Sequence, residues 1–239
     1  MSIYDNREIN RPDPGKPIRQ NNKLSYPFVV KKAPNMRFEI TQQDKAALCR
    51  QAPEFTELIK QANVQSFDCS SDPFFALVQS IVWQQLSFKA ASAVFDRVEK
   101  LLDPITAKNL LEASFDDLRT CGLSARKIEY LQGIAKAKMN NTIDFDALPQ
   151  KSDQEVIDEL VQLKGVGVWT AEMLLIFALG RKDVLSFKDL GIRRGIMLLH
   201  QLDSLDEEEF EVYRKRYSPY GTLASLLLWQ IKDGGLRIK

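Results

Sequence analysis

A short turn that contains two glycines is the part of the chain best suited to bind an anion. It lies within residues 160–171 (LVQLKGVGVWTA), where the end of one helix is followed by Gly165, Gly167 and the start of another. Glycines adopt backbone conformations that other residues resist, and their missing side chains let a phosphate approach the amides from Gly165 to Val168. Such amides at a helix N-terminus attract anions. A plain turn is the alternative for an isolated Gly-x-Gly, but the flanking apolar residues and the Trp-Thr-Ala sequence favour a phosphate site.

This segment resembles the helix-hairpin-helix signature of the DNA glycosylase superfamily, which includes endonuclease III, 8-oxoguanine glycosylase and 3-methyladenine DNA glycosylase II. The resemblance extends to residues 184–195 (VLSFKDLGIRRG), 74–87 (FFALVQSIVWQQLS) and 122–127 (GLSARK), so it runs from about residue 70 to the C-terminus. The alkylpurine glycosylases are the most similar members. The resemblance implies an all-α fold of two helical lobes with the active-site cleft between them, and damaged double-stranded DNA as the partner.

The resemblance also implies that Asp189 is the catalytic residue. Hydrolysis of an N-glycosidic bond passes through a sugar with oxocarbenium character, so a carboxylate near the anomeric carbon stabilises the developing positive charge and can orient or deprotonate a water molecule. An alkylated purine such as 3-methyladenine already carries positive charge and leaves without a general acid, unlike an O-glycoside that needs two carboxyl groups. Taken alone, Asp189 would be interpreted as a helix N-cap, a role that is compatible with catalysis.

Trp169 occupies the position at which strand-cutting members of the superfamily carry a Schiff-base lysine. We therefore expect a monofunctional enzyme that leaves an abasic site. In the alkylpurine glycosylases a tryptophan here lines the base pocket, where its electron-rich face attracts a cationic base; a core tryptophan is the alternative. Tyr220 is the second pocket candidate because it follows a proline, as an aromatic residue does in the family. Residues 221–222 (GT) depart from the family's Arg-Ser pair, and a surface tyrosine before a helix is an equally good interpretation.

A wedge residue is expected in the loop after residue 83. Enzymes that act on a base extrude it from the stack and usually fill the gap with a side chain. Gln85 matches the family's wedge position best, and its neighbour Leu86 is expected to share that role, because the alignment of residues 83–87 (WQQLS) is ambiguous by one position. Buried amides in a loop would be the simpler explanation.

The hairpin supplies the expected contacts to the DNA backbone. The contacts to phosphate are expected at Gly165, Val166, Gly167, Val168 and Thr170. No cofactor is required, but family members commonly bind a monovalent cation, Na⁺ or K⁺, through hairpin carbonyls. The corresponding carbonyls here are those of Val161, Leu163 and Val166.

Helices must position these groups. From residue 41 onward, apolar residues recur at spacings of three and four without convincing strand alternation, which predicts about nine short helices and a compact all-α fold. Side-chain acceptors mark three helix starts, and predict helices over residues 88–101, over residues 125–138 and after Ser152, where Glu155 completes a capping box. Helix ends are expected at glycines suited to a left-handed cap and before prolines: Gly122, Gly180, Pro104, Pro149 and Pro219.

The chain divides into a tail and one domain. Residues 1–37 carry eight Lys and Arg residues against few acids and show no apolar periodicity, so we interpret them as a polar basic tail. Residues 38–239 are expected to form the glycosylase domain. Its middle-helix lobe covers about 73–188, and its second lobe covers about 41–72 plus 189–239.

Composition excludes several other classes of protein. The 239 residues include 33 Lys and Arg against 32 Asp and Glu, so net charge gives no support to a nucleic-acid partner. Three separated cysteines form no CxxC pair, which argues against a zinc ribbon or an iron–sulfur cluster. No apolar run is long enough to span a bilayer, and no signal peptide is evident. We expect an intracellular monomer that binds no membrane and lies in the cytoplasm or nucleoid of a bacterium or the nucleus of a eukaryote.

Three alternative functions remain open from the sequence. The first is a DNA-binding or damage-sensing protein that has lost catalysis, which the presence of Asp189 opposes. The second is a glycosylase for another lesion, such as uracil or an oxidised purine, but a neutral base would need more help to leave than the sequence offers. The third is a bifunctional lyase, which Trp169 opposes.

Overall fold

Helices are the main secondary structure of the chain in the computed structural model, which describes residues 18–20, 23–25, 36–62 and 64–232. The helices are α1 (Gln42–Gln51), α2 (Thr56–Gln61), α3 (Pro73–Trp83), α4 (Phe88–Leu102), α5 (Ala107–Glu112), α6 (Phe115–Thr120), α7 (Ala125–Met139), α8 (Asp153–Leu160), α9 (Val168–Phe177), α10 (Leu190–His200), α11 (Glu207–Tyr217) and α12 (Gly221–Lys232). Single 3₁₀ turns lie at Pro53–Phe55 and Leu148–Gln150. Among these described residues, no helix is long and apolar enough to cross a membrane.

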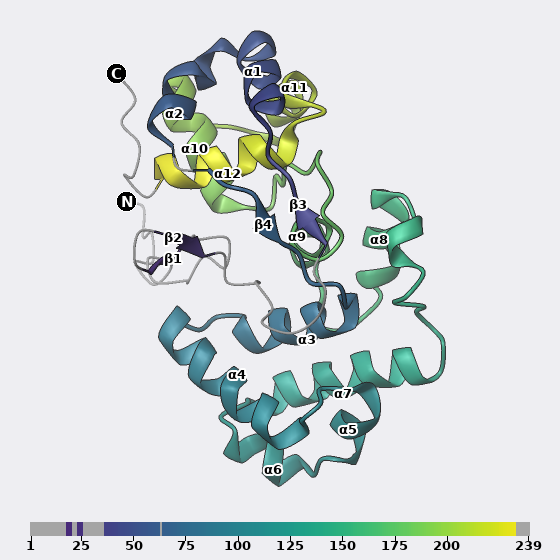
Figure 1. Cartoon of the computed structure of the whole chain (residues 1–239). Coiled ribbons are helices and arrows are strands. Elements are labelled where there is room, and N and C mark those ends of the chain that lie inside the picture. The colour runs from purple at the N-terminus through teal and green to yellow at the C-terminus, as the bar shows by residue number, and fades with distance from the viewer. Residues whose placement is uncertain (1–17, 21–22, 26–35, 63, 233–239) are drawn as a thin grey trace, which may run out of the picture.

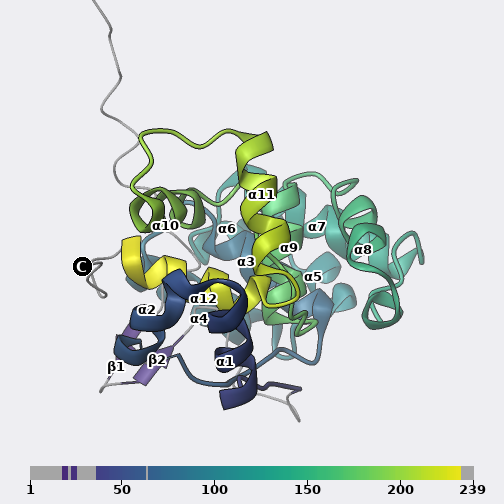
Figure 2. The ribbon, with the colours of Figure 1, turned by 90° about the horizontal axis from the view of Figure 1, so that it is seen from above.

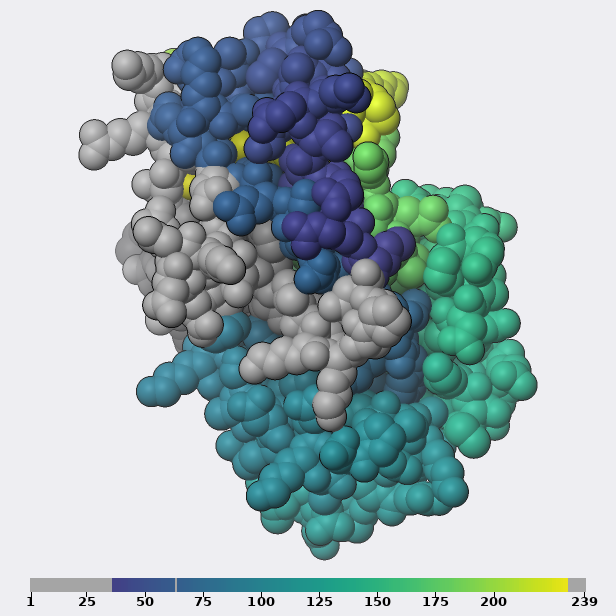
Figure 3. Space-filling model, in the orientation of Figure 1, coloured from purple at the N-terminus to yellow at the C-terminus, as the bar shows by residue number. Residues whose placement is uncertain are grey.

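Two groups of helices lie on either side of α9 (Figure 1). In one group α1 and α12 both contact α11, and α10 packs along α12; in the other, α7 contacts α3, α5 and α6. The view from above also places α12 among α1, α2, α10 and α11 (Figure 2). The space-filling view shows the group with α1 and α2 at the top and the group with α4 to α7 at the bottom (Figure 3). Helix α9 contacts α3, which belongs to the second group, and it also contacts α8.

The predicted helix starts are confirmed. Ser87, Ser124 and Ser152 each accept a hydrogen bond from the backbone N–H three residues later, and Glu155 completes the capping box of α8. Both α4 and α7 extend one residue beyond the predicted ends. Such a difference is ordinary, because the last turn of a helix has few side-chain signals.

The predicted number of about nine helices is wrong in detail. The described residues contain twelve α-helices, of which α2, α5 and α6 have six residues each, too short to show a clear apolar period. Two pairs of very short strands are also present: β1 (Ile18–Gln20) with β2 (Lys23–Ser25), and β3 (Arg37–Phe38) with β4 (Phe67–Asp68), both antiparallel. Strands β1 and β2 lie within the expected tail, the rest of which, apart from residues 36–37, lies outside the described residues.

The core is continuous across the elements that meet near α9. Phe38 of β3 stacks on Phe67 of β4 at 4.9 Å between ring centroids, and Phe67 contacts Phe177 at the end of α9 at 5.6 Å. Phe177 in turn stacks on Trp229 of α12 at 6.2 Å. The small β3–β4 pair therefore supports the buried side of α9 and α12, which together flank the candidate site.

Candidate active site

Asp189 is a buried carboxylate immediately before α10. Its side chain is the N-cap of that helix, because Oδ1 accepts a hydrogen bond from the Ile192 N–H at 2.8 Å. The residue is only 2% exposed. The capping role foreseen for Asp189 is thus present, and it holds one carboxylate oxygen in a fixed place at the start of the helix.

Two tryptophans from different helices donate to this carboxylate. Trp169, in the first turn of α9, donates its indole N–H to Asp189 Oδ2 at 2.8 Å. Trp229 of α12 donates to Oδ1 at 3.1 Å. Trp169 is partly buried, whereas Trp229 is 1% exposed and has one ring face stacked on Phe177. Trp229 was not singled out from the sequence, in which nothing indicates its contact with Asp189.

A close approach of α10 and α12 brings Trp229 to Asp189. A Cβ added at Gly195 of α10 would lie 2.7 Å from the Leu228 carbonyl oxygen of α12, so only a residue without a side chain allows this packing. Leu228 directly precedes Trp229. The glycine therefore sets the spacing of the two helices next to the residue that reaches the carboxylate.

A second buried carboxyl group stabilises the loop before Asp189. Glu172 of α9 is 6% exposed and accepts a hydrogen bond from the Ser186 hydroxyl, which is fully buried. Burial raises the pKa of Glu172, and the neighbouring charge of Asp189 acts in the same direction, whereas Ser186, Arg214 and Lys188 oppose them. The Ser186 carbonyl accepts the Asp189 N–H at 3.3 Å. Glu172 and Ser186 therefore connect α9 to the loop that carries Asp189, and neither was singled out from the sequence.

The hairpin forms a tight turn between α8 and α9. Its backbone closes through bonds from Leu163 N–H to the Leu160 carbonyl and from Val166 N–H to the Leu163 carbonyl, both 3.1 Å. Gly165 has φ +86°, and a Cβ there would lie 2.2 Å from the Tyr130 ring of α7. Gly167 is the N-cap of α9, and a Cβ there would meet nothing within 4 Å. The first glycine is thus required by the fold, and the second leaves open space before the helix.

The predicted phosphate contacts fit this turn unequally. Val168 is 40% exposed in the first turn of α9, where backbone N–H groups lack intrahelical partners. The Val166 N–H is already used within the turn, and the Val166 side chain is 6% exposed. Thr170 is 4% exposed, so its side chain does not face solvent. The accessible amides therefore belong to the residues around Gly167.

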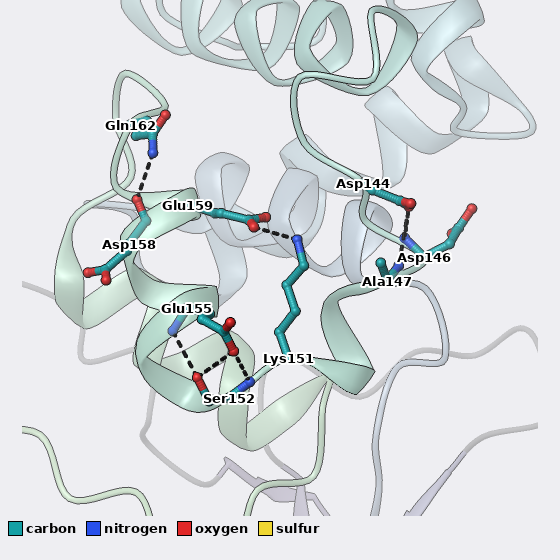
Figure 4. A network of polar contacts seen from close by, with 9 residues as sticks. All are labelled: Asp144, Asp146, Ala147, Lys151, Ser152, Glu155, Asp158, Glu159 and Gln162. Carbon is teal, nitrogen blue, oxygen red and sulfur yellow. Dashed lines mark hydrogen bonds and ion pairs between the residues drawn. The ribbon is translucent and has the colours of Figure 1, made fainter.

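A polar network fixes α8, the helix that leads into the hairpin (Figure 4). The Lys151 ammonium group contacts Glu159, with both side chains about one-quarter to one-third exposed, at 26% and 30%. The Ser152–Glu155 capping box begins the helix, and the Gln162 amide donates to the Asp158 carbonyl at 3.2 Å. Arg181, which follows α9, donates to the Lys151 carbonyl at 2.6 Å. Glu159, before the hairpin, and Arg181, after α9, therefore both contact Lys151.

The expected wedge loop connects α3 to α4. Gln85 is exposed and has φ +58°, a conformation that non-glycine residues rarely adopt. Leu86 is partly buried and packs against the core, and its N–H donates to the Trp83 carbonyl at 3.3 Å. Of the two candidates, Gln85 is the more exposed.

Tyr220 lies beside α1, where it lines a hollow of about 530 Å³ with Gln42, Asp44 and Arg50 among other residues. Residues 221–222 are held to the segment that follows α9, since the Gly221 N–H donates to Asp183 and the Thr222 hydroxyl donates to the Arg181 carbonyl. The structure brings Trp169 and Asp189 together and adds Trp229 to them.

Comparisons with known proteins agree with this architecture. A family model described as the HhH-GPD superfamily of base excision DNA repair proteins matches residues 78–219. DNA-3-methyladenine glycosylase 1 of Schizosaccharomyces pombe is 36% identical over 164 residues, which cover 66% of the chain and 72% of that relative. A crystal structure of a Bacillus halodurans DNA-3-methyladenine glycosidase superposes with a TM-score of 0.71 at 36% identity, covering 82% of the chain and 92% of that structure.

A solved complex with DNA is also similar. The S. pombe 3-methyladenine DNA glycosylase in complex with abasic DNA gives a TM-score of 0.70 at 30% identity, and the match covers 82% of the chain and all of that structure (100%). The all-α fold expected from the sequence is therefore confirmed.

Proposed function

The chain belongs to the HhH-GPD superfamily of base excision DNA repair proteins, and we propose from this premise that it is a monofunctional DNA-3-methyladenine glycosylase. It binds damaged duplex DNA, flips out an alkylated purine of the 3-methyladenine or 7-methylguanine type, and hydrolyses the N-glycosidic bond to leave an abasic site. One observation carries the proposal most directly: the buried Asp189 carboxylate is held by the indole N–H groups of Trp169 and Trp229.

Asp189 is suited to stabilise positive charge on the sugar. The hydrogen bonds described above all come from N–H donors, which suit an ionised carboxylate and fix its orientation before the substrate arrives. As the bond between C1′ and the purine breaks, positive charge develops on the sugar next to this carboxylate. The electron pair of that bond leaves with the cationic purine, which becomes neutral. Water then adds to C1′, and Asp189 accepts or directs its proton.

The two indole rings have different roles in the pocket. Trp169 points its N–H edge at Asp189, which leaves its ring face to contact a cationic base by cation–π attraction. Trp229 has one face against Phe177 and its N–H on the carboxylate, so it acts as a rigid support. We propose Trp229, rather than Tyr220, as the second aromatic residue of the site. Trp169 also stands where a lyase would carry its lysine, so no Schiff base forms and the strand remains intact.

The hairpin and the wedge loop hold the DNA on either side of the lesion. The amides around Gly167 would bind a phosphate of the damaged strand, and Gln85 would fill the space left by the extruded base. The carbonyls of Val161, Leu163 and Val166 are neutral oxygen ligands of the kind that suits Na⁺ or K⁺. The Leu163 carbonyl also accepts a hydrogen bond from the Val166 N–H, which leaves its second lone pair for a cation. A cation there would bridge the hairpin to the phosphate. The described residues contain no cluster of His, Cys, Asp or Glu suited to a metal ion.

The test of this function measures which product the enzyme releases. The protein is incubated with methylated duplex DNA, free purines are separated by chromatography, and strand lengths are compared with and without alkali. We expect release of 3-methyladenine and 7-methylguanine, with strands that break only after alkali treatment. Tight DNA binding without release would favour a non-catalytic damage sensor, and breakage without alkali would favour a lyase.

A further inference from the structure

Lys127 is a half-buried lysine in the first turn of α7 that contacts the end of another helix. Its Nζ donates to the carbonyl oxygens of Val82 at 2.6 Å and Gln84 at 2.7 Å. Val82 lies in the last turn of α3, and Gln84 is the residue that ends it. Carbonyls at a helix C-terminus lack intrahelical partners and attract a positive charge. Lys127 thus caps α3 from a neighbouring helix.

The location of this ammonium group is energetically costly. Burial lowers the pKa of Lys127 to about 8, because surroundings with little water disfavour its charged form. The residue also sits at the N-terminal end of α7, where the helix dipole disfavours a cation. The contacts with the two carbonyls offset these costs. Both carbonyls lie where α3 ends and the next loop begins.

That loop is the one that carries Gln85. The residue has the strained φ of +58° and follows directly after the carbonyl of Gln84 that Lys127 holds. The side chain of Gln84 donates to the Gly165 carbonyl of the hairpin at 3.0 Å. Gln84 therefore joins the wedge loop to the turn that faces the DNA backbone.

Helix α7 also supports the hairpin itself. Tyr130 lies one turn after Lys127 and packs against Gly165 so closely that a Cβ there would lie 2.2 Å from its ring. Glu129 forms an ion pair with Lys164 of the hairpin at 3.1 Å. The first turns of α7 thus contact both elements proposed to bind DNA, which lie about 80 residues apart in the sequence.

We propose that Lys127 is a positioning residue that sets the wedge loop at a fixed distance from the hairpin. With Lys127 in place, Gln85 enters the duplex while the hairpin holds the phosphate of the flipped nucleotide. Without the Lys127 ammonium group, the loop is no longer held at a fixed distance from the hairpin, so extrusion of a paired base slows. The inference rests on the proposed function, and it assigns to Lys127 a step that precedes the chemistry at Asp189.

The experiment separates base extrusion from bond hydrolysis. Single-turnover release of 7-methylguanine is measured from a duplex in which it pairs with cytosine and from one in which it faces adenine, since a mismatched base costs least to flip. We expect Lys127→Met to slow release from the paired duplex by about tenfold or more, with a much smaller change on the mismatched duplex. The ratio of the two rate constants is the readout, because a general loss of folded enzyme would lower both equally.

Further variants complete the design. Lys136→Met is the matched control, since Lys136 is exposed on the same helix and its ratio should equal that of the wild type. Gln84→Met keeps the side-chain length but removes the donor to Gly165, and it should show the same selective loss as Lys127→Met. If Lys127→Met does not fold, the Gln84→Met ratio decides. The double variant with Lys127→Met and Gln85→Ala should show little more change in this ratio than the more affected of the two single variants, because both substitutions act through one loop.

The outcomes distinguish the two proposals. If Lys127→Met, or Gln84→Met in its place, matches Lys136→Met or slows both duplexes equally, the positioning role is overturned while the glycosylase function stands. If the wild type releases no 7-methylguanine from either duplex, the proposed function fails and this inference fails with it.

Discussion

The carboxylate of Asp189 divides its hydrogen bonds between the start of α10 and two indole rings. Oδ1 accepts from Ile192 and Trp229, and Oδ2 accepts from Trp169. A side chain held at both oxygens has already lost its rotational freedom before the reaction begins. Stabilising groups fixed in advance need no reorganisation as charge develops, which is where much of the catalytic advantage of an enzyme site arises.

Trp229 offers the residue-scale test of this arrangement. Replacing Trp229 with Phe keeps the aromatic ring against Phe177 but removes the N–H donor to Oδ1. We expect the single-turnover rate constant to fall by about tenfold, the effect of about one lost charge-assisted hydrogen bond. The melting temperature, measured in parallel, controls for a loss of packing. An unchanged rate constant in the folded variant would show that the Trp229 N–H does not orient the carboxylate.

At the scale of elements, the two hairpin glycines serve different purposes. Gly165 is confined by its positive φ and by the Tyr130 ring of α7, so its role is structural. Gly167 has ordinary backbone angles and open space around its Cα hydrogens, so the fold does not require a glycine there. An approaching phosphate would occupy the space into which a side chain at Gly167 would project.

Replacing each glycine with alanine should therefore affect a different property: stability at Gly165 and DNA binding at Gly167. Gly165→Ala should lower the free energy of unfolding by about 1–3 kcal/mol, because it combines left-handed strain with a clash. Gly167→Ala should change stability little but weaken binding to a duplex that contains an abasic site. Chemical denaturation and equilibrium binding measure the two effects. Equal losses of stability, or unchanged binding by Gly167→Ala, would contradict the division of roles.

The sequence signals for single elements were strong where side chains act on their own backbone. Ser87, Ser124 and Ser152 cap helices within three residues, so their positions could be predicted. The strands β3 and β4 have two residues each and pair across about 30 positions, which leaves no periodic pattern. Lys127 was seen only as part of a helix start, because its partners lie more than 40 residues earlier.

At the scale of the whole molecule, the site depends on contacts that no local pattern contains. Trp169 and Asp189 could be predicted because the family motif spans both. The contact of Trp229 with Asp189 joins residues 40 positions apart, and it depends on the close packing that Gly195 allows between α10 and α12. Tyr220 followed a motif in sequence, yet its contacts place it beside α1. Spatial neighbours of a catalytic residue are set by packing, which a single sequence does not show.

The most direct test of the account replaces Asp189 with Asn, which keeps the shape and the capping oxygen but removes the charge. Single-turnover release of 7-methylguanine from duplex DNA is measured for both proteins, together with their affinity for a duplex that contains an abasic site. We predict that the rate constant falls by at least about a hundredfold while the affinity stays within a few-fold, since the lost charge acts mainly on the transition state. A variant that keeps a rate constant close to that of the wild type would contradict the assignment of the chemistry to Asp189.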